Sequence, residues 1–283
     1  MIPENYIQEW RETAPWSEPS MVEQDLIICR ALVCIFKDEY LRSNLAFRGG
    51  TALHKLYLQP QVRYSEDIDL VQIHSGPIKP ILERLGEVLS WLPDKVTKQK
   101  RYNNTLLFRI ESETPPVQQM RLKVEINCYE HFSVLGFREI PFEVKSGWFE
   151  GSCNLTTYHL DELIGTKLRA LYQRKKGRDL FDLETALKSG QLDIDKVFQC
   201  YLKYMSFTAG SAPTFKQYKQ NLDLKMEDDE FLDDMKPLLR TDAQDFNPLE
   251  AYCLIGKSLV EKMRLIKGVQ KTEESASLSK RRH

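Results

Sequence analysis

The sequence predicts an α+β protein in which a mixed sheet with flanking helices is followed by an all-helical C-terminal domain. In the first half of the chain, segments with strand-like alternation follow segments with helical periodicity, as in a sheet covered by helices. From about Tyr158 onward, apolar residues recur almost only at helical spacing. We therefore expect a sheet domain over residues 1–155, a helical domain over 156–270 and a flexible tail over 271–283.

The N-terminal elements alternate between helix and strand. A long helix is expected from Ser20 through about Leu41, and Glu23, three residues after Ser20, fits a capping box. The next expected elements are a strand in "NLAFRGG" (44–50), a helix in "TALHKLYL" (51–58), a strand in "DIDLVQI" (67–73) and a helix from Pro77 through about Trp91.

A β region follows, and then helices. Strands are expected on either side of Asn103 within 94–112, in "MRLKVEINCY" (120–129) and in "REIPFEVKS" (138–146). Residues 159–190 are helical by period, with Gly190 as the C-terminal stop. Further helices are expected in 193–207, 212–222, 227–239 and 247–268.

The composition is that of an ordinary soluble globular protein, with 42% hydrophobic and 29% charged residues. No apolar run approaches the roughly 20 residues that span a membrane, and the N-terminus lacks the regions of a signal peptide. We therefore expect a cytoplasmic protein with no membrane partner. The net charge of -1 neither requires nor excludes a nucleic-acid partner, and the acidic run 226–235 is interpreted as a solvated surface.

Two carboxylates on one predicted strand indicate a metal site. Asp67 and Asp69 are two residues apart, so their side chains point to the same face, whereas Glu66 points to the other. A divalent cation between them removes their repulsion, and oxygen ligands of this kind suit Mg²⁺. Glu125, on the polar face of a predicted strand, is the candidate third ligand.

A glycine turn precedes this strand. Gly49 and Gly50 lie between a predicted strand and the start of a helix, where the backbone can approach a phosphate closely. Thr51 and Ser65 can add hydroxyl contacts to that phosphate. The order of a glycine turn, a helix and then S-x-D-x-D on the next strand favours a site for metal and phosphate.

The stretch "GGTALHKLY…RYSEDIDL" resembles motif I of the polymerase-β-type nucleotidyltransferase superfamily, and within it the AbiEii-like toxins of type IV toxin–antitoxin pairs, a group that includes the MenT toxins. The resemblance implies a nucleotidyltransferase fold in residues 1–155, a helical domain that completes the active site, and transfer of NMP from an NTP with Mg²⁺. It also implies a cognate antitoxin encoded nearby.

A second block, "KLRALYQRKKGRDLFDL" (167–183), is similar to the family's K-x-x-A-L-x-x-R…R-D-x-x-D-L element. The resemblance makes Lys167 the residue that holds nucleotide phosphates, with Arg174 and Asp179 in nucleotide binding and Asp182 in catalysis. By spacing alone, Lys167, Arg174 and Asp182 share one helical stripe if the helix continues through Gly177, and Arg178 can pair with Asp182.

For MenT relatives, the implied acceptor is the 3′ end of tRNA, so that translation or growth is inhibited. A polynucleotide needs a cationic groove, and the residues available for it are Lys98, Lys100, Arg101, Arg174, Lys175 and Lys176. Tyr57, Tyr102 or Tyr172 can stack on a base. Two alternatives stay open: transfer to a protein hydroxyl or small molecule, and a non-catalytic NTP-binding interaction module.

Overall fold

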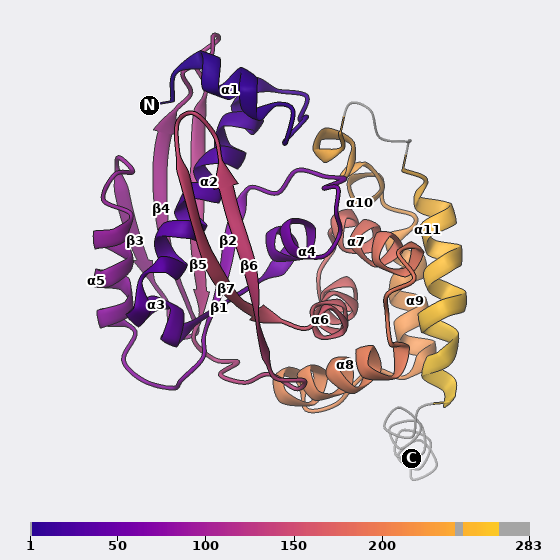
Figure 1. Ribbon diagram of the computed structural model, residues 1–283. Coiled ribbons are helices and arrows are strands. Elements are labelled where there is room, and N and C mark those ends of the chain that lie inside the picture. Colours follow the sequence, from indigo (N-terminus) through magenta and orange to yellow (C-terminus); the bar gives the residue numbers. More distant parts are fainter. Residues whose placement is uncertain (1, 241–245, 266–283) are drawn as a thin grey trace. The chain divides into compact units, whose positions relative to one another are not determined.

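The computed structural model describes residues 2–240 and 246–265 (Figure 1). Within them the chain divides into two compact units, one of residues 2–159 with 238–240 and the other of 160–237 with 246–265. The tail predicted over 271–283 lies outside the described residues. None of the described helices combines the length and the apolar character needed to cross a bilayer.

One sheet organises the first unit. Its strands are β1 (Leu45–Arg48), β2 (Asp67–Gln72), β3 (Lys95–Gln99), β4 (Asn103–Glu111), β5 (Gln119–Asn127), β6 (Phe137–Lys145) and β7 (Glu150–Tyr158). They lie in the order β3-β4-β5-β2-β1-β7-β6. The β2–β5 and β1–β7 pairs are parallel and the others antiparallel, so the sheet is mixed as predicted.

Helices cover one face of this sheet. The helices of the first unit are α1 (Glu4–Trp10), α2 (Pro19–Lys37), α3 (Glu39–Asn44), α4 (Gly49–Leu56) and α5 (Lys79–Val88). The long helix α2 runs across the strands in Figure 1 and contacts β2, β5, β6 and β7. Ile68 and Leu70 of β2 and Val124 and Ile126 of β5 point into the core on this side, each at most 1% exposed.

Two details of helix α2 differ from the long helix predicted after Ser20. The capping box at Ser20 is wrong, because Pro19 is already in the first turn and Ser20 donates its hydroxyl to Gln118 Oε1 instead. The helix also does not continue to Leu41. Asp38 interrupts it and caps α3 by accepting a hydrogen bond from the Leu41 N–H at 2.9 Å.

Strand β7 is an element that the hydrophobic pattern does not predict. Its residues are mostly small and polar, and only Leu155 is a fully buried aliphatic side chain. Tertiary pairing makes the strand nonetheless, since β7 lies between β1 and β6 and pairs along its whole length with β6. Weak alternation is therefore a poor guide where a strand has partners on both edges.

The second unit is helical, as predicted. Its elements are α6 (Leu160–Gln173), α7 (Gly177–Lys188), α8 (Ile194–Ala209), α9 (Phe215–Lys225), α10 (Asp229–Asp233), α11 (Pro248–Ile255), the 3₁₀ turns η1 (Lys236–Leu238) and η3 (Glu261–Leu265), and the π turn η2 (Gly256–Val260). Helix α6 packs on α7 and α8, and α7 packs on α11. Gly190, at φ +69°, follows the end of α7 as predicted.

Residues 159–190 form two helices and not one. The chain leaves the helix after Gln173 and starts again at Gly177. A β-carbon at Gly177 would overlap the Phe231 carbonyl oxygen, so glycine permits the close approach of the neighbouring backbone here. The condition for a continuous stripe, a helix that runs through Gly177, is therefore not met.

Candidate active site

The two aspartates of β2 lie on the face of the sheet opposite the α2 core. Asp67 and Asp69 alternate with the buried Ile68 and Leu70, and both aspartates are partly exposed. Alternation along a strand places two carboxylates side by side on an accessible surface.

The glycine turn holds the second of these carboxylates. Gly49 has φ +79° and starts α4, and a β-carbon there would overlap Asp69 Oδ2. A residue with a side chain would meet both a strained backbone and the carboxylate. The turn and the carboxylate are therefore in direct contact, and the absence of a side chain at Gly49 leaves room for the Asp69 carboxylate.

Thr51 and Ser65 tie α4 to the acidic strand. Thr51 is 1% exposed and donates its hydroxyl to the Asp67 carbonyl oxygen at 2.5 Å. Its oxygen also lies 2.7 Å from Ser65 Oγ. In this structure the Thr51 hydroxyl is used inside the protein, while Ser65 stays partly exposed beside it.

Arg63 is a residue of this site that the sequence reasoning missed. Its side chain is 1% exposed, and Nη1 donates to the Tyr64 carbonyl oxygen at 2.9 Å. A β-carbon at Gly50 would overlap its guanidinium, so a buried positive charge lies directly behind the turn. In the sequence, the feature that could have indicated this role is the arginine directly before "YSED".

The electrostatics of Asp67 reflect this crowding. Burial first, then the charge of Asp69, and more weakly those of Glu66 and Glu125, raise the pKa of Asp67 to about 7, although Lys123 acts in the opposite direction. The fold therefore favours the protonated form of a carboxyl that is normally ionised well below neutral pH. A bound cation in the place of that proton would relieve the same repulsion.

Glu125 lies on the strand next to the aspartates. The parallel pairing of β2 and β5 sets Asp69 opposite Glu125 and Asp67 opposite Lys123. The Glu125 carboxylate forms a close ion pair with the Lys123 ammonium. Within residues 2–240 and 246–265, no group of three or more His, Cys, Asp or Glu side chains is arranged to hold a metal.

The donor set therefore fits a cation held by two carboxylates. Mg²⁺ is commonly held by one or two carboxylates, with waters and substrate phosphates completing its octahedron. Asp67 and Asp69 provide such a pair. Glu125, opposite Asp69, is paired through Oε2 with the Lys123 ammonium.

The helical unit gathers a second set of predicted residues. Because α6 and α7 fold back on each other, Lys167 Nζ lies 3.0 Å from Asp179 Oδ1 and 2.7 Å from Asp182 Oδ2. Both aspartates are fully buried and Lys167 is 6% exposed. Arg174 Nε and Nη2 add a two-pronged contact to Asp179, at 2.7 and 2.8 Å.

The charges of this cluster compensate one another. Burial would raise the pKa of Asp179, but Lys167 and Arg174 outweigh it and the pKa is lowered. The Arg174 side chain is 53% exposed, so it is the cation of the cluster that solvent reaches most readily. The predicted Arg178–Asp182 pair is wrong, since Arg178 Nε pairs with Asp234 at 3.3 Å.

The basic segment 174–178 is matched by the acidic run. Lys175 Nζ lies 2.7 Å from Asp228 Oδ2, and Lys176 Nζ lies 3.7 Å from Asp234 Oδ1. The interpretation of 226–235 as a purely solvated surface is therefore wrong for these two aspartates. Their pairing reduces the positive field that Lys175 and Lys176 offer to a polyanion.

The other basic segment keeps its charge. Lys98, Lys100 and Arg101, at the tip of the β3–β4 hairpin, are exposed and form no ion pair within the part of the chain that the structure describes. Arg101 lies 5.0 Å from the ring centre of Tyr102, and that ring lies 4.6 Å from the ring of Tyr129. Both tyrosines are exposed, by 43% and 38%.

Strand register connects this hairpin with the aspartates. Lys98 is opposite Thr105, Thr105 opposite Glu125, and Glu125 opposite Asp69. Directly opposite residues in a sheet share a face. Three strand spacings of about 4.8 Å put Lys98 roughly 14 Å from Asp69 along one open face.

Comparison with known proteins identifies the family of this chain. A family model described as the nucleotidyl transferase AbiEii toxin of type IV toxin–antitoxin systems matches residues 30–252, well over half of the chain. No curated protein sequence gives a significant match.

Three solved structures share the fold. The MenT4 nucleotidyltransferase toxin of Mycobacterium tuberculosis is 15% identical with a TM-score of 0.64, covering 96% of this chain and 93% of its own. JHP933 of Helicobacter pylori is 20% identical (TM-score 0.52; 94% and 99% covered), and a putative nucleotidyltransferase of H. pylori is 21% identical (TM-score 0.51; 90% and 98%). The predicted fold class and family resemblance are confirmed.

Proposed function

Since the chain belongs to the AbiEii nucleotidyltransferase toxins of type IV toxin–antitoxin systems, we propose that it transfers NMP from an NTP onto an RNA acceptor, the tRNA 3′ end, in an Mg²⁺-dependent reaction. The observation that carries this proposal is the Asp67–Asp69 pair on β2 with the glycine turn against Asp69. Transfer in the cytoplasm would inhibit translation or growth until a cognate antitoxin, encoded nearby, opposes it.

Each residue has a role that its surroundings support. Asp67 and Asp69 hold the cation, and Gly49, Gly50 and Ser65 border the space for NTP phosphates. When bound, Mg²⁺ would activate the acceptor hydroxyl and neutralise the pyrophosphate that leaves. Thr51 keeps the turn in register with the strand through its bond to the Asp67 carbonyl oxygen.

In the helical unit, we propose that Lys167 and Arg174 act on the nucleotide phosphates. Asp179 and Asp182 orient the Lys167 ammonium, which is the role their 3.0 and 2.7 Å contacts support. Glu125, on the neighbouring strand, remains a proposed third ligand beside its pair with Lys123.

The RNA acceptor is supported by the β3–β4 hairpin. Lys98, Lys100 and Arg101 supply exposed positive charge, and Tyr102 and Tyr129 supply ring faces. Together these are the features of a single-strand binding surface, where phosphates meet cations and bases stack on aromatic rings.

The test is a transfer assay with purified protein, Mg²⁺, total tRNA and each of the four α-labelled NTPs. We expect label in tRNA, at a terminal position that mild periodate oxidation and 3′ mapping locate. Asp69→Asn should abolish transfer. Asp94→Asn is the matched control, since Asp94 is an exposed carboxylate paired with Arg109.

Other results would replace the proposal with an alternative. Label on a protein or on a small molecule, with none on RNA, would make the acceptor a protein hydroxyl or small molecule. NTP binding without transfer to any acceptor would indicate a non-catalytic interaction module.

A further inference from the structure

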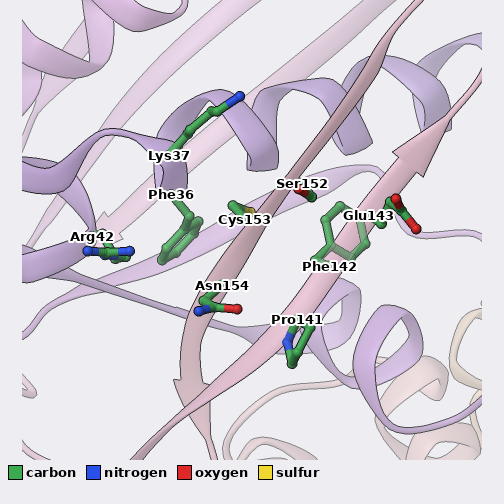
Figure 2. A pocket seen from close by; sticks show the side chains of 9 residues that line it. All are labelled: Phe36, Lys37, Arg42, Pro141, Phe142, Glu143, Ser152, Cys153 and Asn154. Carbon is green, nitrogen blue, oxygen red and sulfur yellow. The ribbon is translucent and has the colours of Figure 1, made fainter.

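The groove between the end of α2, α3 and the β6–β7 hairpin has a volume of about 690 Å³ (Figure 2). Its cations do not converge, since Lys37 points away from Arg42, and Phe36 beside them is fully buried. This groove therefore indicates no ligand. The short helix α10 of the second unit, in contrast, makes contacts that bear on the proposed site.

Helix α10 holds the turn between α6 and α7 through the residues that flank it. At its start, Asp228 accepts the Phe231 N–H at 2.9 Å and pairs with Lys175 at 2.7 Å. In the middle, Phe231 is 1% exposed, and its carbonyl oxygen lies where a β-carbon at Gly177 would overlap it. At its end, Asp234 reaches the first turn of α7.

Asp234 caps α7 from outside that helix. Its Oδ2 accepts the Arg178 backbone N–H at 3.0 Å and the Arg178 Nε–H at 3.3 Å. The first N–H groups of a helix have no partner inside it, and they form the positive end of the helix dipole. Lys176, at the N-cap position of α7, cannot accept a hydrogen bond through its ammonium group. Asp234 therefore supplies the acceptor that an N-cap side chain normally provides.

The capped turn carries residues that we assign to the nucleotide. Asp179 follows Arg178 directly, and its carboxylate holds Lys167 at 3.0 Å and Arg174 at 2.7 and 2.8 Å. Arg174 lies between the two helices, with its side chain 53% exposed. A contact that fixes the start of α7 therefore also fixes Asp179, and through it the two cations.

We propose that Asp234 is a positioning residue for NTP binding, which caps α7 and so keeps Lys167 and Arg174 in place through Asp179. The inference rests on the proposed role of these two cations on the nucleotide phosphates. Since the cap is a hydrogen bond to the Arg178 N–H, it depends on an acceptor oxygen more than on charge. Asparagine should therefore replace aspartate at this position, and alanine should not.

Calorimetric titration of the full chain with each of the four NTPs and Mg²⁺ tests this role. We expect Asp234→Ala to bind NTP about fivefold more weakly than the wild type, since loss of a helix cap changes an equilibrium by about that factor. Asp234→Asn should stay within about twofold of the wild type. Asp233→Ala is the matched control and should bind as the wild type does, because Asp233 is 58% exposed and pairs with the nearby Lys236.

Two further measurements separate positioning from general stability. Hydrogen exchange followed by mass spectrometry should show faster exchange of the amides at 177–180 in Asp234→Ala, but not in Asp234→Asn or Asp233→Ala. In the transfer assay, the Asp234→Ala defect should lie in the KM for NTP, because phosphate contacts act alike on bound substrate and transition state. Loss of folded protein would instead lower kcat at unchanged KM.

Wild-type NTP affinity in Asp234→Ala would overturn the proposal, even with faster exchange at 177–180, because the cap would then serve the fold alone. It would also be overturned by an Asp234→Asn variant as weak as Asp234→Ala, by an equal loss in Asp233→Ala, or by a lower kcat at unchanged KM. A wild-type chain that binds no NTP would overturn both this proposal and the proposed function. NTP binding without transfer to any acceptor bears on the proposed function alone, because the binding comparison needs no acceptor.

Discussion

Asp67 is the residue whose chemistry departs furthest from its ordinary behaviour at the proposed site. Unfolded, it titrates near 3.8, whereas burial and the charge of Asp69 raise its pKa to about 7 in the fold. The folded state binds the proton more tightly between these values, so stability falls as pH rises through that window. Ionised Asp67 thus destabilises the metal-free protein above neutral pH.

We predict that Asp67→Asn unfolds at a higher temperature than the wild type at pH 8 without metal. The gain should be roughly 2 kcal/mol, allowing for the solvent that still reaches the group, and should vanish toward pH 4. Thermal unfolding followed by circular dichroism measures it. A variant that is equally or less stable at pH 8 would contradict the crowding of these carboxylates.

The same pair predicts a metal effect that needs no activity assay. Millimolar Mg²⁺ should raise the unfolding temperature of the wild type at pH 8, because a ligand that binds only the folded state stabilises it. The Asp67→Asn protein should gain less than half of that shift. Equal shifts in both proteins would place the cation elsewhere.

Gly49 is the second residue with a defined physical constraint. We predict that Gly49→Ala lowers stability by more than Gly136→Ala and abolishes transfer. Both glycines have positive φ, +79° and +86°, but a β-carbon at Gly136 meets nothing within 4 Å. The control therefore carries only the backbone cost, about 1–2 kcal/mol. If urea denaturation and activity show equal losses, the contact with Asp69 has no role.

At the scale of elements, the α6–α7 hairpin depends on the buried Lys167. We predict that Lys167→Met costs about 3 kcal/mol, because Asp179 and Asp182 would remain buried with less compensating charge. Asp182→Asn added to Lys167→Met should recover part of that loss. Lys188→Met is the control, since its pair with Glu184 is exposed on the lysine side and should contribute under 1 kcal/mol.

Urea denaturation at neutral pH measures these three variants. A cost for Lys167→Met as small as that for Lys188→Met would show that the cluster is hydrated and not a structural unit. Because loss of Lys167 affects folding, a defect in NTP binding is attributable to Lys167 only at temperatures where the variant is fully folded.

At the scale of the whole molecule, two basic segments are candidates for the RNA-binding surface. We predict that Lys98→Glu/Lys100→Glu weakens tRNA binding more than Lys175→Glu/Lys176→Glu, since the latter pair is already matched by Asp228 and Asp234. Each lost phosphate contact should make the slope of log affinity against log salt shallower by about 0.7 for single strands. Fluorescence anisotropy across a salt series measures both. A larger loss of tRNA affinity in Lys175→Glu/Lys176→Glu would indicate that the acceptor RNA binds the helical unit.

Local order in the sequence determined much of this protein. The glycine turn, the helix after it and the alternation around Asp67 and Asp69 depend on neighbours a few residues apart, and the structure has each of them. The resemblance of those residues to one toxin family was correct for the same reason. Helical periodicity likewise predicted a C-terminal helical region.

Only the tertiary structure decided which distant segments meet. Strand β7 is stabilised by neighbours on both edges, and its own pattern is too weak to predict it. The chain leaves the helix after Gln173 and starts again at Gly177, and in the folded protein Lys167 lies against Asp179 and Asp182. Periodicity reports which face of an element is apolar, but ion pairs and strand neighbours depend on packing between residues far apart in the chain.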